Sequence, residues 1–242
     1  MREPRLRTVD KYTPPYPLNR FPSSFPYNLA KEIVFFLATR HEPRLEGEDW
    51  EEIFARVIGA NWQPSNVGLD DVVLKQCAWG AKTVKANKPS VSKKIRLISG
   101  RNSPVYSYGD SEVSGIDPNE LGEKILEIWN ERVAAVRSKY KHVRTVVLVK
   151  SADLLELVVF EHDTVMFDNS LVSWKWNKNN NLVGIAKNGK TLFTWQPHGS
   201  QFTIHQSIPN DRLALQIKPP TKLDRDTVLK SIKFDKSWVK VL

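Results

Sequence analysis

Two aspartates and a lysine flank a pair of short apolar runs in the segment DDVVLKQCAWGAKTVK, which begins at Asp70. With the period-two alternation of a β-strand, residues 72–74 form one strand and residues 77–84 a second, antiparallel one. In such a hairpin the carboxylate of Asp71 and the ammonium of Lys82 meet at one end, on a scaffold stiff enough to hold a metal ion and a water molecule. A buried lysine is costly unless it is paired, so we expect a carboxylate beside Lys82.

Metal-assisted hydrolysis of a phosphodiester needs few residue types, and this part of the chain contains them. Carboxylates hold one or two Mg²⁺ ions, the ions activate a water molecule, and a lysine orients or deprotonates that water. Asp71 and Lys82 have the types and spacing for these roles, and Glu51 on the preceding helix can reach the same site as a further metal ligand. Asp70 is adjacent, but the alternation points its side chain to the opposite face. The alternative is structural: the aspartates begin a strand, and Lys82 extends along the surface to solvent.

The elements that position these residues are predicted from caps, turns and periodicity. Residues 1–27 are rich in proline, arginine and aromatics and predict an extended arm. Helices are expected from Asn28, from near Gly47 to Gly59, and from Asp117 onward, with a short one at 224–232. Strands are expected at 95–99, 145–150 and 154–160, followed by antiparallel strands over 166–218 with turns at 179–181 and 188–189. This order predicts an α/β fold with a mixed β-sheet and a β-rich antiparallel C-terminal region.

Composition points to one domain with a polyanionic partner. The chain has 242 residues, 40% of them hydrophobic, enough for one substantial core with elaborations. Its net charge of +9 favours nucleic acid or an acidic membrane surface as partner. The single cysteine, Cys77, excludes an internal disulfide framework and a cysteine-based zinc site, and we expect a small buried thiol there. No window has the length of a membrane span and no signal-peptide pattern precedes the fold, so a cytoplasmic protein without membrane partners is expected.

The segment from Asp49 to Lys85 resembles the PD-(D/E)XK nuclease superfamily, and particularly type II restriction endonucleases. In that family a helix bearing a glutamate precedes a hairpin with an aspartate on its first strand, and the second strand ends in (D/E)-X-Lys, often followed by threonine. Here Asp71 matches the first acid, the Lys82-Thr83 pair matches the terminal Lys-Thr, and Glu51 matches the helix acid.

The sequence departs from this pattern at Gly80, which occupies the position of the second acid. A glycine supplies no carboxylate, so another group must complete the metal site. The options are Glu51, Asp70 or the main-chain carbonyl beside Lys82.

The resemblance implies a PD-(D/E)XK-like mixed β-sheet flanked by helices. The chain would divide into an arm at 1–27, a nuclease core at 28–165 and a DNA-recognition region at 166–242, integrated into a single domain. The expected function is a sequence-specific double-stranded DNA endonuclease of a restriction system, with Mg²⁺ as cofactor. A homodimer is expected, because a two-fold pair most simply cuts both strands of a palindrome. Two alternatives stay open: a non-catalytic nucleic-acid-binding protein, and a structure-specific resolvase or nicking nuclease of the same superfamily.

Two sets of residues are candidates for DNA contacts. The first follows the hairpin, where charge of one sign would hold phosphates; its members are Lys85, Lys88, Lys93, Lys94, Arg101, Asn102 and Ser103. The second lies in the C-terminal hairpins, where aromatic and polar side chains alternate as in a β-ribbon that enters a groove; its members are Lys175, Asn177, Gln196, His198 and Gln201. The structural alternatives are a solvated lysine loop for the first set and the solvent face of an ordinary sheet for the second.

Overall fold

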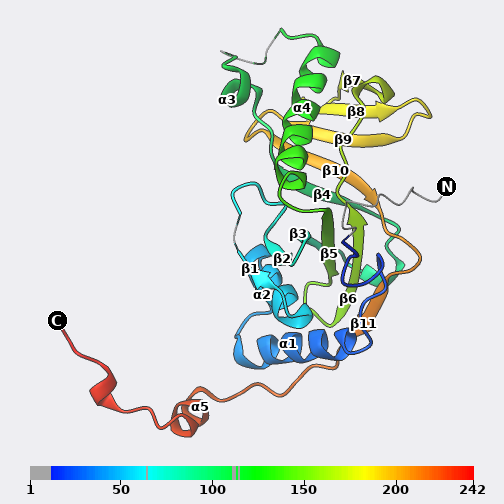
Figure 1. Cartoon of the computed structure of the whole chain (residues 1–242). Helices are drawn as coiled ribbons and strands as arrows, with labels where there is room; N and C mark the ends of the chain where they lie inside the picture. The colour runs from blue at the N-terminus through cyan, green and yellow to red at the C-terminus, as the bar shows by residue number, and fades with distance from the viewer. Residues whose placement is uncertain (1–11, 64, 111–112, 114) are drawn as a thin grey trace.

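Two β-sheets and the helices that cover them make up the described part of the chain, residues 12–63, 65–110, 113 and 115–242 of this computed structural model (Figure 1). The helices in these residues are α1 (Phe25–Thr39), α2 (Gly47–Ile58), α3 (Pro104–Tyr108), α4 (Pro118–Arg137) and α5 (Arg225–Ser231). The first sheet contains, in spatial order, β1 (Asn61–Trp62), β2 (Val72–Leu74), β3 (Cys77–Lys85), β5 (His142–Lys150), β6 (Glu156–Asp163) and β11 (Leu213–Gln216). The second contains β4 (Lys94–Arg101), β10 (Gln201–Ser207), β9 (Thr191–Gln196), β8 (Leu182–Ala186) and β7 (Val172–Trp176).

The first sheet is mixed because β3 pairs in both senses. It is antiparallel to β2 and parallel to β5. A parallel pair needs a long crossover connection, and the chain between β3 and β5 supplies it with β4, α3 and α4. The interior of β5, residues 143–149, is buried throughout, which explains the apolar run at 146–149.

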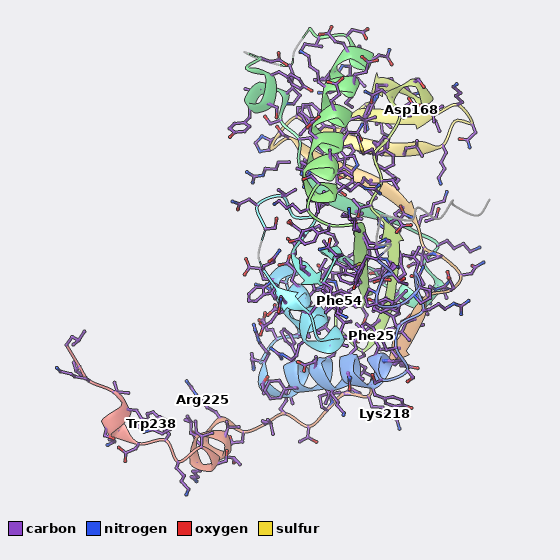
Figure 2. The ribbon with its side chains drawn as sticks, in the orientation of Figure 1. Phe25, Phe54, Asp168, Lys218, Arg225 and Trp238 are labelled. Carbon is purple, nitrogen blue, oxygen red and sulfur yellow. The ribbon has the colours of Figure 1, made fainter. Side chains whose placement is uncertain are left out.

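Helices α1 and α2 cover one face of the first sheet with an aromatic core. Phe54 of α2 contacts both Phe25 of α1 and Trp79 of β3 edge-on, with ring centroids 6.2 and 5.8 Å away. All three side chains are at most 1% exposed, and Figure 2 shows Phe25 and Phe54 between the helices and the sheet. Each such side chain contributes about 1.5–3 kcal/mol through burial, so this core fixes α2 against the hairpin.

The opposite face of the first sheet is covered by β4, while α4 packs against the second sheet. Ile95 and Leu97 of β4 pack on Val147 and Phe160 of the first sheet. The second sheet packs its aromatic side chains, such as Trp195, against the apolar stripe of α4. Val73, Ala78 and Val143 of the first sheet belong to the same cluster as α4, so both α4 and β4 hold the two sheets together.

A buried polar cluster ties the segment before α1 to the first sheet. The Glu161 carboxylate lies 3.2 Å from the Arg144 guanidinium and accepts hydrogen bonds from the Tyr16 hydroxyl at 2.8 Å and the Trp79 indole at 2.6 Å. The Asn19 side chain also donates to the main-chain oxygen of Glu161. Burial raises the pKa of Glu161, and Arg144 opposes that rise. The predicted N-terminal arm is therefore docked over residues 12–24; residues 1–11 lie outside the described part of the chain.

Most predicted elements are present, and the differences have local causes. Helix α1 begins at Phe25, three residues before the predicted cap Asn28, because Pro26 suits the first turn of a helix. The polar stretch after β4 contains the short helix α3, for which the Ser103 side chain accepts a hydrogen bond from the Tyr106 amide. The α/β class with a mixed sheet is confirmed, and each sheet contains strands from both sides of residue 165. No helix in the described ranges has the length and apolarity to cross a bilayer.

Candidate active site at the β2–β3 hairpin

The hairpin brings Asp71 and Lys82 together on one face. Val72 pairs with Trp79 across the hairpin, so one further step places Asp71 opposite Gly80. The Lys82 ammonium lies 3.3 Å from Oδ2 of Asp71, and the Ala81 amide donates to the same oxygen at 3.3 Å. The Asp71 side chain is 4% exposed and that of Lys82 is 22% exposed, so the pair is shielded but open on the lysine side. The predicted carboxylate partner for Lys82 is confirmed.

Glu51 supplies a second carboxylate beside this pair. It lies on α2, which a reciprocal cap between Glu46 and Asp49 begins and the left-handed Gly59 ends. Burial raises the pKa of Glu51, and the negative charge of Asp71 raises it further. A hydrogen bond from the Trp62 indole, 3.2 Å long, and the positive charge of Lys82 oppose that rise. Glu51 is therefore in electrostatic contact with both members of the ion pair.

Asp70 has partners other than Asp71, Lys82 and Glu51. Its carboxylate accepts a hydrogen bond from the Ser65 hydroxyl and lies 3.9 Å from the Lys139 ammonium. Asp71 and Asp70 thus have different partners, as the alternation predicts. These contacts remove Asp70 from the candidate metal ligands.

The space beside Gly80, where the resemblance leads us to expect a second acid, is filled by main chain. A Cβ atom on Gly80 would stand 2.9 Å from the carbonyl oxygen of Gly68 and 3.1 Å from Cα of Leu69. Gly68 adopts a left-handed backbone (φ +67°), and a Cβ on it would lie 3.6 Å from the Lys82 ammonium. Residue 80 therefore has no room for a side chain, and a carbonyl oxygen lies where the second carboxylate would be.

Arg132 of α4, which sequence reasoning missed, joins the segments around the site. Its guanidinium donates to the carbonyl oxygens of Val67 at 2.5 Å and Ser99 at 2.7 Å, and to the Asn102 side chain at 3.1 Å. Burial lowers the pKa of Arg132, and the negative charge of Asp71 opposes that shift. The available signal was an arginine within the apolar stripe of α4, seven residues after Ile125.

An open cleft of about 630 Å³ extends from Lys82 to the end of β4. One wall is the loop of residues 66–68, and the other comprises residues 98–101 of β4 with parts of α3 and α4. Tyr106 and Ile98 line it while remaining 91% and 56% exposed. The cleft therefore combines cationic groups with apolar and aromatic side chains.

One predicted DNA-contacting residue, Arg101, lines the far end of this cleft, and two others lie on the neighbouring strands. Arg101 of β4 is paired with Gln201 of β10, which is paired with Gln196 of β9. Three neighbouring strands thus present polar side chains at one end of the second sheet. His198 lies exposed in the following turn and lines a hollow of about 350 Å³ with Gln196.

Two further candidates lie on β7 and in the turn after it. Lys175 is exposed on β7. Asn177 accepts hydrogen bonds from the amides of Asn179 and Asn181, so its side-chain oxygen stabilises the turn.

The predicted basic surface does not form as one unit. Lys94 begins the strand that Arg101 ends, about 23 Å away at a rise of ~3.3 Å per residue, and Lys93 precedes it. Lys88 lies before β4 and close to Glu156, also away from the cleft. Lys85 points to the other face of β3 from Lys82 and lines a separate hollow of about 400 Å³. These four lysines therefore do not line the cleft beside Lys82, because Lys88, Lys93 and Lys94 lie before or at the start of β4 and Lys85 lies on the other face of β3.

Asn102 and Ser103 have structural partners. Asn102 is 0% exposed, and its side-chain nitrogen donates to the carbonyl oxygen of Ile125 at 2.9 Å. Because its oxygen accepts from Arg132, the predicted DNA contact from Asn102 is wrong in this arrangement. Ser103 caps α3.

The donors at the hairpin fit a magnesium ion in part. Among the residues that the structure describes, no group of three or more Asp, Glu, His or Cys side chains is placed to hold a metal ion. Mg²⁺ usually keeps several waters and binds through one or two carboxylates. Asp71 and Glu51 can supply these, with water and main-chain oxygens such as that of Gly68 completing the shell.

Comparison of this chain with protein-family models, with curated proteins and with solved structures finds no match. The function is therefore inferred from the geometry of the site.

Proposed function

We propose that this protein is a Mg²⁺-dependent endonuclease for double-stranded DNA, of the PD-(D/E)XK type, with the sequence specificity of a type II restriction enzyme. The supporting observation is the 3.3 Å approach of the Lys82 ammonium to the Asp71 carboxylate at the head of an open cleft. A carboxylate for the metal and an ammonium for the water, on one face of a rigid hairpin, meet the minimum for metal-assisted phosphodiester hydrolysis. The packing of α2 on this hairpin and the mixed sheet that contains β3 also suit this superfamily.

The residues take the following roles. Asp71 and Glu51 hold Mg²⁺, which when bound activates water and neutralises charge on the phosphate. Lys82 orients the attacking water and stabilises the negative charge that develops on the phosphate oxygens. Asp71 keeps the Lys82 ammonium in place, and Arg132 holds the 66–68 loop and the end of β4 at the two sides of the cleft.

The second sheet supports recognition of sequence. Arg101, Gln201 and Gln196 lie side by side on three strands, and their side chains are of the types that hydrogen-bond to base edges. Arg101 also lines the cleft that contains Lys82. A DNA strand whose phosphate reaches Lys82 would therefore bring neighbouring bases to these side chains.

Cleavage of plasmid and linear DNA, with MgCl₂ or EDTA, tests this proposal. The wild type should give discrete fragments in magnesium only, and Lys82→Ala should lower the cleavage rate by about 10²–10⁴-fold while DNA binding is largely kept. Lys85→Ala is the matched control, since it alters the same strand on the opposite face. A Lys82→Ala protein that cuts at a near wild-type rate would contradict the assignment, as would a folded wild type that cuts no DNA in magnesium.

A DNA-binding protein without hydrolytic activity is the second candidate. It is favoured by the ion pair between Asp71 and Lys82, which can serve stability alone, and by the lack of a group of three or more metal-ligating side chains among the described residues. The same assay separates the candidates, because a binder gives a shifted band and no fragments. Fragments at fixed positions in linear DNA would further distinguish a sequence-reading enzyme from a structure-specific resolvase or nicking nuclease.

A further inference from the structure

The C-terminal tail, residues 218–242, extends away from the body from a point beside α1. Figure 2 shows Lys218 next to α1, with Arg225 and Trp238 far from both sheets. Residues 218–242, all within the described part of the chain, include no buried side chain. The apolar side chains that are at least 36% exposed in this tail are Leu223, Val228, Ile232, Phe234, Trp238, Val239, Val241 and Leu242.

The tail has local structure without a core of its own. The Asp224 carboxylate accepts a hydrogen bond from the Thr227 amide at 2.8 Å and begins α5, and the Phe234 and Trp238 rings meet edge-on at 5.7 Å. A helix of seven residues is not stable in water by itself, because the hydrogen bonds of two turns do not offset the entropy of ordering them. The tail therefore needs a surface against which its apolar side chains can pack.

The root of the tail is fixed at the C-terminal end of α1. The Leu223 amide donates to the carbonyl oxygen of Ala38 at 2.9 Å, and the Lys222 ammonium donates to the carbonyl oxygens of Leu37 at 2.6 Å and Arg40 at 2.8 Å. These bonds satisfy carbonyl groups that a helix end leaves free. The tail consequently starts beside the groove between α1 and α2.

That groove offers a matching surface, which we call the α1–α2 face: the groove between α1 and α2 together with the outer side of α1. The groove has a volume of about 160 Å³ and contains Phe35, Ile53 and the carboxylates of Glu32 and Glu52, both of which pair with Arg56 in the same groove. Phe35 is 63% exposed, and Tyr27, two turns earlier on the same side of α1, is 76% exposed. The α1–α2 face is thus partly apolar and carries ion-paired acidic and basic groups at its edge.

The charges of the two segments are opposite. Residues 25–58 contain seven Asp and Glu against four Lys and Arg, a net charge of −3 in a chain whose total is +9. Residues 218–242 contain seven Lys and Arg against three Asp, a net charge of +4. A tail of net charge +4 is attracted to this segment of net charge −3 more than to the other residues, whose net charge is positive.

We propose that the tail of each chain packs on the α1–α2 face of a second copy, in a reciprocal exchange about a two-fold axis. The tail leaves its own groove at the root and continues away from its own body (Figure 1). With two copies related by an axis near the two roots, each tail lies over the partner's groove, and the interface closes as a dimer. This surface is inferred from the packing and charge of the tail, and it stands whether or not the protein cuts DNA.

The molar mass in solution, measured by light scattering and sedimentation on the full chain, tests this inference. The wild type should have twice the mass of one chain, and a variant with Val228→Ser, Ile232→Ser, Phe234→Ser and Trp238→Ser should have the mass of one chain. The matched control carries Val91→Ser, Val165→Ser and Met166→Ser, which replace apolar side chains 66%, 43% and 52% exposed on the body. The control should keep the wild-type mass.

A charge exchange identifies the surface that receives the tail. Glu32→Lys with Glu52→Lys should weaken the dimer, and adding Lys230→Glu with Lys233→Glu should restore it. A tail variant that remains dimeric, or a wild type with the mass of a single chain at 100 µM (on the order of the weakest specific association expected for such an interface), overturns the inference. A tail variant with unchanged mass and weakened DNA binding overturns it in favour of a DNA-binding arm. DNA cleavage by a single-chain species would refute the dimer and leave the proposed function intact.

Discussion

The carbonyl oxygen of Gly68 lies 2.9 Å from the point where a Cβ atom on Gly80 would stand. The loop around Gly68 therefore occupies the space that the second acid of a (D/E)-X-Lys motif requires. The two features depend on each other, since a side chain at position 80 would displace the loop. A metal site at this hairpin has to use the Asp71 carboxylate, the Glu51 carboxylate and main-chain oxygens.

Restoring an acid at position 80 should thus harm the protein. Gly80→Asp and Gly80→Ala should each lower the free energy of unfolding by about 1–3 kcal/mol, because the new side chain overpacks against main chain that cannot rotate away. Neither variant should cut DNA faster than the wild type. Gly47→Ala is the control, since a Cβ there meets nothing within 4 Å. Urea unfolding and plasmid cleavage provide the measurements, and a stable, more active Gly80→Asp protein would show that the loop can move aside.

Arg132 should couple stability to cleavage. Arg132→Gln removes the donors to the carbonyl oxygens of Val67 and Ser99, and the loss should cost about 1–3 kcal/mol. Arg132→Lys keeps the charge, but an ammonium lacks the planar guanidinium that reaches several acceptors at once. This variant should therefore recover only part of the lost unfolding free energy. We expect the cleavage rate to fall in both variants with DNA affinity changed less.

A surface arginine provides the comparison for Arg132. Arg56 forms ion pairs with Glu32 and Glu52 but is 52% exposed, so Arg56→Gln should cost under about 1 kcal/mol. Calorimetric melting and single-turnover cleavage would be measured on all three variants. Equal losses for Arg132→Gln and Arg56→Gln would argue against a special role for Arg132.

The hairpin could be predicted from sequence because its signals are local. Alternation over residues 77–84 predicted the face of Lys82, and the cost of burying its charge predicted Asp71 as a partner. Gly59 and the apolar stripe of Trp50, Ile53 and Phe54 likewise predicted the helix that carries Glu51.

The other parts of the site depend on contacts between distant segments. Arg132 and Gly68 meet only because α4 packs over the loop before the hairpin, and nothing in their spacing indicates this. The basic residues from Lys85 to Arg101 are close in sequence, yet the length of β4 and the two faces of β3 separate them in space. The division of the strands between two sheets also depends on which strands pair, and this is set by packing rather than by composition.

The buried ion pair of Glu161 and Arg144 should anchor the segment before α1. Glu161→Ala leaves the Arg144 guanidinium buried without its carboxylate and should cost about 3–5 kcal/mol. It also removes the acceptor for the Tyr16 hydroxyl, so residues 12–24 should become sensitive to limited proteolysis. Glu120→Ala, where the side chain is 61% exposed and pairs with Lys124, should change the unfolding free energy by under about 0.5 kcal/mol. A Glu161→Ala protein with wild-type stability and protease resistance would contradict this account.

The pH dependence of stability should report on Glu51. Burial and the charge of Asp71 raise its pKa in the folded protein above the ordinary value of 4.5. Because the folded state binds this proton more tightly, the contribution of Glu51 favours folding below pH 4.5 and is lost as the pH rises through the folded pKa. Without magnesium, Glu51→Gln should therefore be more stable than the wild type at pH 7 and should lose that advantage near pH 4. Urea denaturation over this pH range gives the measurement.

Magnesium should make the wild type more stable than Glu51→Gln at pH 7, the reverse of their order without the ion. A divalent cation between the Asp71 and Glu51 carboxylates would offset their repulsion, so Mg²⁺ should raise the melting temperature of the wild type at pH 7. The increase should become smaller at lower pH, because protonated Glu51 binds the ion less well. Glu51→Gln should lose most of this increase. Glu52→Gln is the control, because the Glu52 side chain is 50% exposed and paired with Arg56. If Glu51→Gln shows the same magnesium-dependent increase as the wild type, Glu51 is not a ligand, and the cation must be held by Asp71 with main-chain oxygens and water alone.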